Sequence, residues 1–166
     1  MSAQHAAPAA IELHPWSEQP TVLDALGPAA RARLDGIASR LDVPAGAIIL
    51  RDGAVTPFLG LVEHGRIGLR LAVPDRGTRT VVTIEPGELV GWSAVVPPYR
   101  ATAEAVALED TRIQAFEAVV LRALLASDRD IAAELLPAVL ACVSDRLTTS
   151  WQQLLDLFGT GPVQPW

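Results

Sequence analysis

The stretch GELVGWSAVVPPYRATAEAV, residues 87–106, is the most informative part of this sequence. Glu88 follows a glycine near its start, and Arg100 stands directly before three small residues. Residues 89–99 between them carry no charge. An apolar segment that serves only packing usually lacks both a carboxylate and a guanidinium, because burying charge is costly. The two charges therefore need an explanation beyond packing.

Short strands surround this stretch. From Asp42 onward, apolar runs such as AIIL, FLGLVEHGRIGLRLAV and TVVTI alternate with glycine, proline and charged residues. Strands of this length, with turn signals every 8 to 12 residues or so, are typical of an antiparallel sandwich or barrel. The sequence thus predicts a mainly β fold, a jelly-roll-like barrel over about residues 43–117.

Apolar residues at helical spacing lie on both sides of the predicted strands. Apolar positions from Thr21 to Leu41, interrupted by a Gly-Pro pair, predict a short helix followed by a second one. The helical period returns at about Ala118, and a longer helix begins near Asp130. Pro137 suits the first turn of a helix better than its interior, so we expect a start or a kink there.

The long helix carries an apolar stripe at steps of three and four residues, the spacing of a seam that packs on a partner helix. A monomer would expose this stripe, so the pattern predicts a homodimer through the C-terminal helix. The stripe consists of Leu136, Leu140, Val143, Leu147, Trp151, Leu154 and Phe158.

Length and composition limit the domain organisation. The 166 residues, half of them hydrophobic, suffice for one well-filled domain. We expect a flexible arm at residues 1–20, one domain at 21–158 with C-terminal helices over about 118–158, and a tail at 159–166. No apolar stretch approaches the roughly 20 residues that span a bilayer, and the N-terminus lacks a signal-peptide pattern. These features predict a cytoplasmic protein without a membrane partner.

Charge and cysteine content exclude further classes. The net charge is −6, and all 13 basic residues are arginine. Binding to nucleic acid rests on concentrated positive charge, so DNA is a poor candidate partner. The single cysteine, Cys142, lies on an apolar helical pattern and is interpreted as an inert packed thiol in a reducing compartment.

Helices, about eight short strands, a helix and a long helix follow one another in an order that resembles the cyclic-nucleotide-binding domain of the Crp/Fnr (catabolite activator) and protein kinase A regulatory subunit superfamily. Three turn glycines support the resemblance: Gly46 in DVPAGAIIL, Gly53 in RDGA and Gly65 in VEHGRI. The resemblance covers about residues 21–158. Transcription factors of this superfamily continue into a helix-turn-helix domain, whereas only GTGPVQPW follows Phe158, so a stand-alone domain without DNA binding is expected.

The resemblance implies a site for a cyclic nucleotide. In the family a short helix begins at a Gly-Glu pair, here Gly87 and Glu88, and the free amides of its first turn, including that of Leu89, face the cyclic phosphate. Glu88 would accept a hydrogen bond from the ribose 2′-hydroxyl, and Arg100 would pair with a phosphate oxygen. Ala101 resembles the cAMP-preferring pattern, with cGMP as the second choice of ligand and no other cofactor implied.

Other contacts stay open at this point. Thr102 either adds a hydroxyl contact or faces the barrel. Ser150 is the candidate contact to the purine on the long helix, and Trp151 either stacks on the purine or packs on a partner helix. The loop 89–99 is longer than usual between the two anchors, so it either bulges outward or refills the pocket, and Trp92 is either core or ligand platform.

Two functions remain after an enzyme is set aside. Metal-dependent cupins need several histidines and a carboxylate in the barrel, and this segment offers only His64, beside a turn glycine. The first function is a sensor of a cyclic nucleotide that signals through a separate, unidentified protein. The second is a structural or interaction module with a degenerate pocket, in which Glu88 and Arg100 form a buried ion pair.

Overall fold

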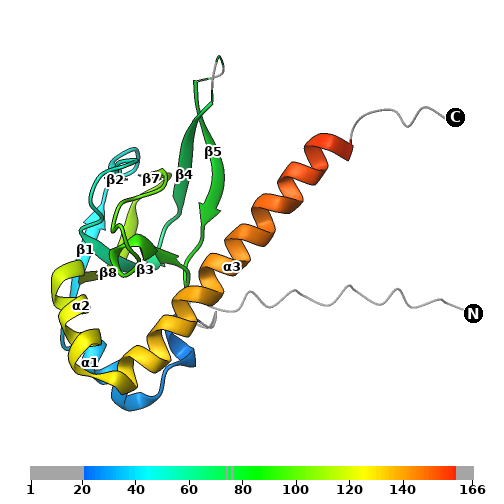
Figure 1. Ribbon diagram of the computed structural model, residues 1–166. Coiled ribbons are helices and arrows are strands. Elements are labelled where there is room, and N and C mark those ends of the chain that lie inside the picture. Colours follow the sequence, from blue (N-terminus) through cyan, green and yellow to red (C-terminus); the bar gives the residue numbers. More distant parts are fainter. Residues whose placement is uncertain (1–20, 74, 76, 160–166) are drawn as a thin grey trace, which may run out of the picture.

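The computed structural model describes residues 21–73, 75 and 77–159, and it consists of two packed β-sheets with helices at one end (Figure 1). The predicted arm 1–20 and nearly all of the predicted tail lie outside the described residues. The predicted mainly β fold with flanking helices and a long C-terminal helix is confirmed.

Each sheet has four antiparallel strands. In the first, the order is β1 (Ala38–Val43), β8 (Thr111–Glu117), β3 (Phe58–His64) and β6 (Leu89–Val90). In the second, it is β2 (Ile48–Leu50), β7 (Glu104–Ala107), β4 (Ile67–Val73) and β5 (Gly77–Ile84). Side chains such as Val62, Ile67, Ile84 and Ile113 fill the space between the sheets.

The helices gather mainly at one end of the sheets, from which the longest extends past β5 (Figure 1). They are the 3-10 helices η1 (Val22–Ala25) and η2 (Trp92–Ala94), and the α-helices α1 (Pro28–Asp35), α2 (Ala118–Ser127) and α3 (Arg129–Gly159). A second core joins η1, α1, α2 and the first half of α3 to the first sheet, and includes Leu23, Leu34, Phe116, Leu121 and Leu135.

The second N-terminal helix is shorter in the structure than the sequence predicted. It ends at Asp35, and Ala38–Val43 form strand β1 instead. Leu41 pairs with Ile113 of β8 and packs against the core between the sheets, while Arg40 and Asp42 point outward. Alternation along a strand, with pairing to a partner remote in sequence, overrides the local helical spacing here.

Pro137 lies inside α3, eight residues after its first residue, so the expectation of a helix start there is wrong. The proline only removes a hydrogen bond to the carbonyl of Ala133. Packing of Leu135 and Val139 on either side holds the helix across this position.

The glycines predicted at strand turns all adopt the left-handed conformation: Gly46, Gly53 and Gly65 have φ of 82°, 71° and 79°. Gly65 is the most constrained of them. A Cβ atom there would lie 2.5 Å from the carbonyl oxygen of Asp110 and 2.6 Å from Oγ1 of Thr111. The β3–β4 turn therefore requires glycine for both its conformation and its close approach.

Candidate functional site

The turn at residues 85–88 uses its backbone amides for folding. Gly87, at φ 90°, donates its amide to the carbonyl of Val62 at 2.8 Å, and Glu88 donates to the carbonyl of Glu85 at 3.2 Å. The Glu88 carboxylate accepts a hydrogen bond from the Glu85 amide at 2.7 Å. The expectation that a short helix begins at Gly87–Glu88 is wrong, since this segment is a closed turn that leads directly into β6.

The short helix begins four residues later. Gly91 precedes η2 in the left-handed conformation at φ 73°, and a Cβ atom there would lie 2.4 Å from the carbonyl oxygen of Phe58. Ala94 donates to the carbonyl of Gly91 at 2.9 Å. The glycine that opens the short helix is thus Gly91, and Trp92 occupies the place that the resemblance gives to a glutamate.

Trp92 is a core residue in this arrangement. Its indole is partly buried and packs against the helical core, in which Leu89 and Ala94 are fully buried. Of the two interpretations of Trp92, packing is the one that the contacts favour. An indole cannot accept a hydrogen bond from a ribose hydroxyl, so this position offers no substitute for the carboxylate.

Arg100 lies at the other end of the segment that we call the cassette, residues 91–101. Its side chain is exposed, and Nη1 donates to the carbonyl of Gly53 at 2.8 Å. The following amide, of Ala101, donates to the carbonyl of Ala54 at 2.9 Å, and the Ala101 carbonyl accepts from Gly53 at 2.9 Å. Ala101 is buried and Thr102 is exposed. The guanidinium has five N–H donors, so most of them stay open for a ligand.

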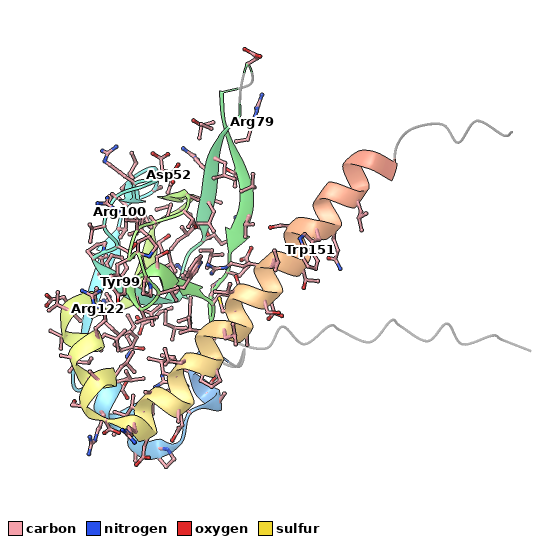
Figure 2. The ribbon with its side chains drawn as sticks, viewed as in Figure 1. Asp52, Arg79, Tyr99, Arg100, Arg122 and Trp151 are labelled. Carbon is pink, nitrogen blue, oxygen red and sulfur yellow. The ribbon has the colours of Figure 1, made fainter. Side chains whose placement is uncertain are left out.

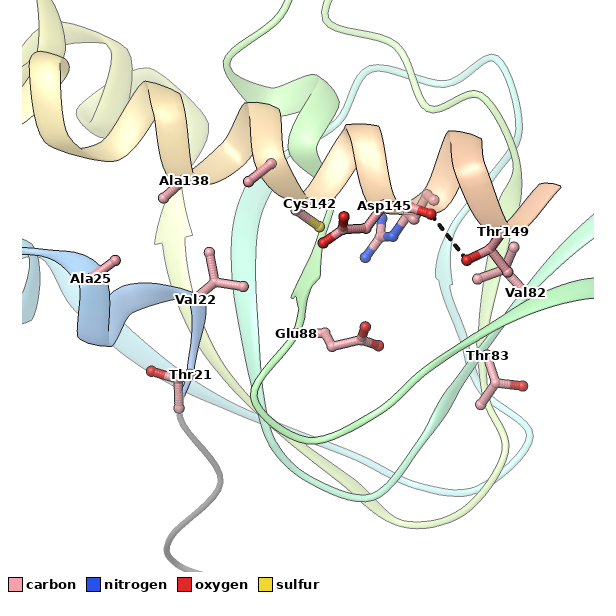
Figure 3. Close-up of a pocket in the computed structure, with 12 residues that line it drawn as sticks. Thr21, Val22, Ala25, Val82, Thr83, Glu88, Ala138, Cys142, Asp145 and Thr149 are labelled. Carbon is pink, nitrogen blue, oxygen red and sulfur yellow. Dashed lines mark hydrogen bonds between the residues drawn. The ribbon is translucent and has the colours of Figure 1, made fainter. Parts of the chain in front are cut away.

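The structure does not bring Glu88 and Arg100 together. Both side chains are exposed, and no ion pair joins them within the described part of the chain. Arg100 lies near the loop that follows β2 (Figure 2), whereas Glu88 faces α3 (Figure 3). The alternative of a buried ion pair between them is therefore wrong.

Arg122 of α2 holds the cassette from the helical side. Its Nη1 donates to the carbonyl of Ala94 at 2.8 Å, and its guanidinium carbon lies 4.5 Å from the centre of the Tyr99 ring (Figure 2). Tyr99 has φ of 62°, which is unfavourable for a bulky side chain. Arg122 thus stabilises the strained residue next to Arg100. Sequence reasoning missed it, although a lone arginine in the apolar run AVVLRALLAS was the available signal.

The long helix contacts β6 and shares the helical core with Ala94 of the cassette. Arg146 donates a hydrogen bond to the carbonyl of Leu89, the predicted site residue at the start of β6. The hydroxyl of Ser150 donates to the carbonyl of Arg146 at 2.9 Å, within its own helix. Ser150 is therefore bonded to the helix backbone, and its contact to a purine stays a prediction.

A cavity of about 310 Å³ separates α3 from η1, β5 and the turn at 85–88 (Figure 3). We call it the α3 cavity. Its lining residues are Thr21, Val22, Ala25, Val82, Thr83, Glu88, Ala138, Ala141, Cys142, Asp145, Arg146 and Thr149. It includes Glu88 but neither Arg100 nor Ser150, so the residues predicted for one nucleotide site are divided between two places.

Cys142 is buried as predicted, at the inner side of this cavity. Burial raises the pKa of its thiol above the ordinary value, and the nearby Arg146 guanidinium offsets part of the rise. Its role as an inert packing residue agrees with this environment.

Metal binding and membrane insertion find no support in the described part of the chain. Within residues 21–73, 75 and 77–159, no group of three or more His, Cys, Asp or Glu is placed to hold a metal ion. The same residues contain no helix with the length and apolar character that crossing a bilayer demands.

Comparison with known families agrees with this geometry. The sequence model of the cyclic nucleotide-binding domain family matches residues 40–128, which is more than half of the chain. The matched range contains most of β1, all strands from β2 to β8, and the cassette, including Arg100. The protein therefore belongs to the cyclic nucleotide-binding domain family, as the resemblance predicted.

Solved structures share the fold. A cyclic nucleotide-binding domain from Methylobacillus flagellatus has a TM-score of 0.72 at 19% identity, over 79% of this chain and 74% of that one. A Geobacter metallireducens protein assigned to the cyclic nucleotide-binding class has a TM-score of 0.68 at 23% identity, over 76% and 91%.

The Catabolite Activator Protein of Thermus thermophilus is 26% identical, with a TM-score of 0.63 over 83% of this chain. The chain spans only 62% of that protein. No curated protein matches the chain in sequence.

Proposed function

We propose that this protein is a regulatory domain, not an enzyme, that binds a cyclic nucleotide at the cassette. cAMP is the first candidate and cGMP the second. The domain acts in the cytoplasm as a homodimer and passes its state to a separate protein. The single observation that carries the proposal is Arg100, an exposed guanidinium at the end of the cassette, inside the range that matches the family.

Arg100 supplies the chemistry that a cyclic phosphate needs. Its planar, permanently charged fork can pair with a non-bridging phosphate oxygen while one donor keeps the bond to Gly53. The small side chain of Ala101 lets a ligand approach the backbone. The next residue, Thr102, is exposed. The alanine after the arginine also carries the preference for cAMP that the family resemblance implies.

The proposal assigns Glu88 no contact with the ribose. Its carboxylate faces the space beneath α3 and not the cassette, and the amides of Gly87 and Glu88 already have acceptors. Neither Glu88 nor position 92 therefore offers a carboxylate to the 2′-hydroxyl of a nucleotide at Arg100 in this arrangement. Phosphate recognition by Arg100 becomes the main polar contribution to affinity.

The outer face of α3 supports the homodimer. At about 100° per residue, the stripe from Leu136 to Trp151 points roughly 140° away from the face that packs on the domain. Leu140 is 68% exposed and Trp151 58%, and Leu136 and Leu147 are also exposed. The side chains of Leu154 and Phe158 lie outside the described part of the chain. A stripe of this length fits a second copy of the same helix.

A second candidate function is an interaction module of the same fold that binds no nucleotide. The observation that favours it is Trp92 in the place of the glutamate, together with the engaged amide of Ala101. Each removes one contact that a nucleotide would otherwise make.

Thermal unfolding with added nucleotide separates the two candidates. A ligand that binds only the native state stabilises it by roughly 2.7 kcal/mol at about 100 times its dissociation constant. For a domain of this size this raises the melting temperature by about 5 to 10 °C. Arg100→Ala is expected to abolish the rise. Glu88→Gln is the matched control and keeps it, because this side chain lies outside the cassette.

The second candidate is supported if millimolar cAMP and cGMP leave the wild-type melting curve unchanged. The dimer is tested separately by light scattering. Leu147→Glu is expected to give a monomer with intact sheets, because it places a charge in the apolar stripe. Thr148→Glu, at an exposed neighbouring position outside the stripe, is expected to leave the dimer intact.

A further inference from the structure

The α3 cavity contains charges that the proposed nucleotide site does not use. Glu88 approaches it from the turn at 85–88 and Asp145 from α3, so that the two carboxylates lie across the same space (Figure 3). Neither forms an ion pair with any described residue. The one cation in the lining is Arg146, and it donates to the carbonyl of Leu89. The formal charge of the lining is therefore −1.

The rest of the lining is apolar or carries hydroxyl groups. Val22 and Ala25 come from η1, Val82 from β5, and Ala138 and Ala141 from α3. The hydroxyl of Thr149 donates to the carbonyl of Asp145 at 3.0 Å, so its oxygen can still accept a hydrogen bond. A volume of about 310 Å³ is at the small end of pockets that hold small molecules.

This combination selects ligands by charge. An anion such as a phosphate would meet two carboxylates and is disfavoured by like charge. A protonated amine can pair with both carboxylates and bond to the threonine oxygen, while a compact apolar body covers the valine and alanine side chains. The cavity also lies on the inward face of α3, away from the stripe of the proposed dimer, so a second copy would leave it open.

We propose that the α3 cavity is a second ligand site, separate from the cassette, and that it takes a small organic molecule with a protonated amine. Glu88 and Asp145 bind the ammonium group, and Val22, Val82 and Ala138 contact the apolar body. The ligand contacts η1, β5 and α3 at once and so holds the long helix against the second sheet.

Cys142 provides a direct measurement, since it is the single cysteine of the chain and lines the cavity. Three probes share one skeleton and differ in charge: benzylamine, benzyl alcohol and benzoate. The modification of Cys142 by methyl methanethiosulfonate, a neutral thiol reagent, is followed by mass spectrometry over hours at roughly pH 8, because burial raises the pKa of this thiol and only its small thiolate fraction reacts. A bound probe slows this reaction.

Benzylamine is expected to protect Cys142 with a dissociation constant roughly three- to tenfold lower than that of benzyl alcohol, as two exposed charge pairs would give. Benzoate is expected not to protect. In the double variant Glu88→Gln/Asp145→Asn, benzylamine and benzyl alcohol should protect equally. The matched control Glu63→Gln/Asp75→Asn removes the same charge from exposed positions outside the cavity and should keep the preference.

Arg100→Ala should also leave the protection by benzylamine unchanged, which distinguishes this site from the nucleotide site. The proposal is overturned if benzoate protects as well as benzylamine, if the double variant keeps the preference, or if no probe protects at tens of millimolar. If the double variant fails to fold, the three probes on the wild-type chain decide the question: protection that decreases from benzylamine to benzyl alcohol to benzoate supports the site, and any other order overturns it.

Discussion

The turn at residues 85–88 and the cassette at 91–101 both rely on a glycine in the left-handed conformation, yet their backbone amides differ. In the turn, Gly87 and Glu88 each donate to a main-chain carbonyl. In the cassette, the amides of Trp92 and Ser93 have no acceptor among the described residues. Two segments that both begin with a glycine thus differ: the turn uses its amides within the fold, and the cassette has two amides without an acceptor among the described residues.

This difference shows why the residues around a glycine do not identify a phosphate site by themselves. A Gly-Glu pair matches the family pattern in letters, but its amides are already satisfied. Backbone polar groups in a folded protein are nearly always paired, so unpaired ones are the more informative signal.

The largest expected effect on stability comes from replacing Gly91 of the cassette by alanine, compared with the same replacement at Gly87 of the turn. Gly91→Ala should destabilise the protein by about 3 kcal/mol or more, because the new Cβ would meet the Phe58 carbonyl at 2.4 Å in addition to the unfavourable φ. Gly87→Ala should cost about 1–2 kcal/mol for its φ. Urea unfolding measures both values, and equal losses would contradict the comparison.

Arg122→Met should loosen the cassette and leave the turn unchanged. It removes the hydrogen bond to the Ala94 carbonyl and the contact with the Tyr99 ring, for a loss of about 1–3 kcal/mol. Hydrogen exchange is expected to become faster at residues 92–100 and not at 85–88. Tyr99 is the single tyrosine, so its ring resonances report the lost contact without ambiguity. Uniform acceleration in both segments would show that Arg122 stabilises the whole fold.

Lowering the pH is expected to loosen the turn at residues 85–88 before it loosens the cassette. The Asp24 carboxylate accepts a hydrogen bond from the Thr21 amide, which lowers the pKa of Asp24 below its ordinary value of 3.8. A lowered pKa gives stabilisation that is complete above the ordinary value and is lost as the pH falls through the lowered one. Because Val22 of the same short helix donates to the Gly87 carbonyl, protonation should loosen the turn first.

Amide exchange measured between about pH 5 and pH 2 tests this order, because this range starts above the ordinary pKa of Asp24 and continues well below it. Asp24→Asn should make the turn insensitive to pH over this range. Earlier loosening of the cassette in the wild-type chain would disprove the link between Asp24 and the turn.

The smallest expected effect is the discrimination between cAMP and its 2′-deoxy analogue. With Trp92 in place of a carboxylate, the 2′-hydroxyl has no charged acceptor at the cassette. Calorimetry is expected to give dissociation constants within about threefold of each other, less than the roughly 1 kcal/mol of an ordinary hydrogen bond. A ratio of tens would mean that a carboxylate reaches the ribose after all, and Glu88 would be the first residue to test.

Much of the fold could be predicted from the sequence because it depends on local patterns. Helical spacing placed α2 and α3 closely, and the turn glycines were identified at Gly46, Gly53 and Gly65. The prediction of a helix over residues 37–41 was wrong because Ile37 and Leu41 fit a helix and a strand about equally well. Its pairing with β8, more than 70 residues later, decided the outcome.

The candidate site was less predictable. Arg100 and Ala101 were predicted as site residues from a short motif, and their contacts with a ligand stay a prediction. The choice of Glu88 over Trp92 depended on which segment forms a helix. That choice is set by hydrogen bonds to Val62 and Glu85, which no local pattern encodes. The orientation of the Ser150 hydroxyl toward its own helix could not be inferred from residue type either.

The length of α3 gives this domain a mechanical property. Its 31 residues extend about 46 Å, and its inward contacts involve mainly the first two thirds (Figure 1). A tilt of only 5° or so at the base would move the far end by roughly 4 Å, given this length. The far end of the helix therefore moves much further than its base. Small rearrangements at Arg122 or in the α3 cavity would be magnified where a partner chain could detect them.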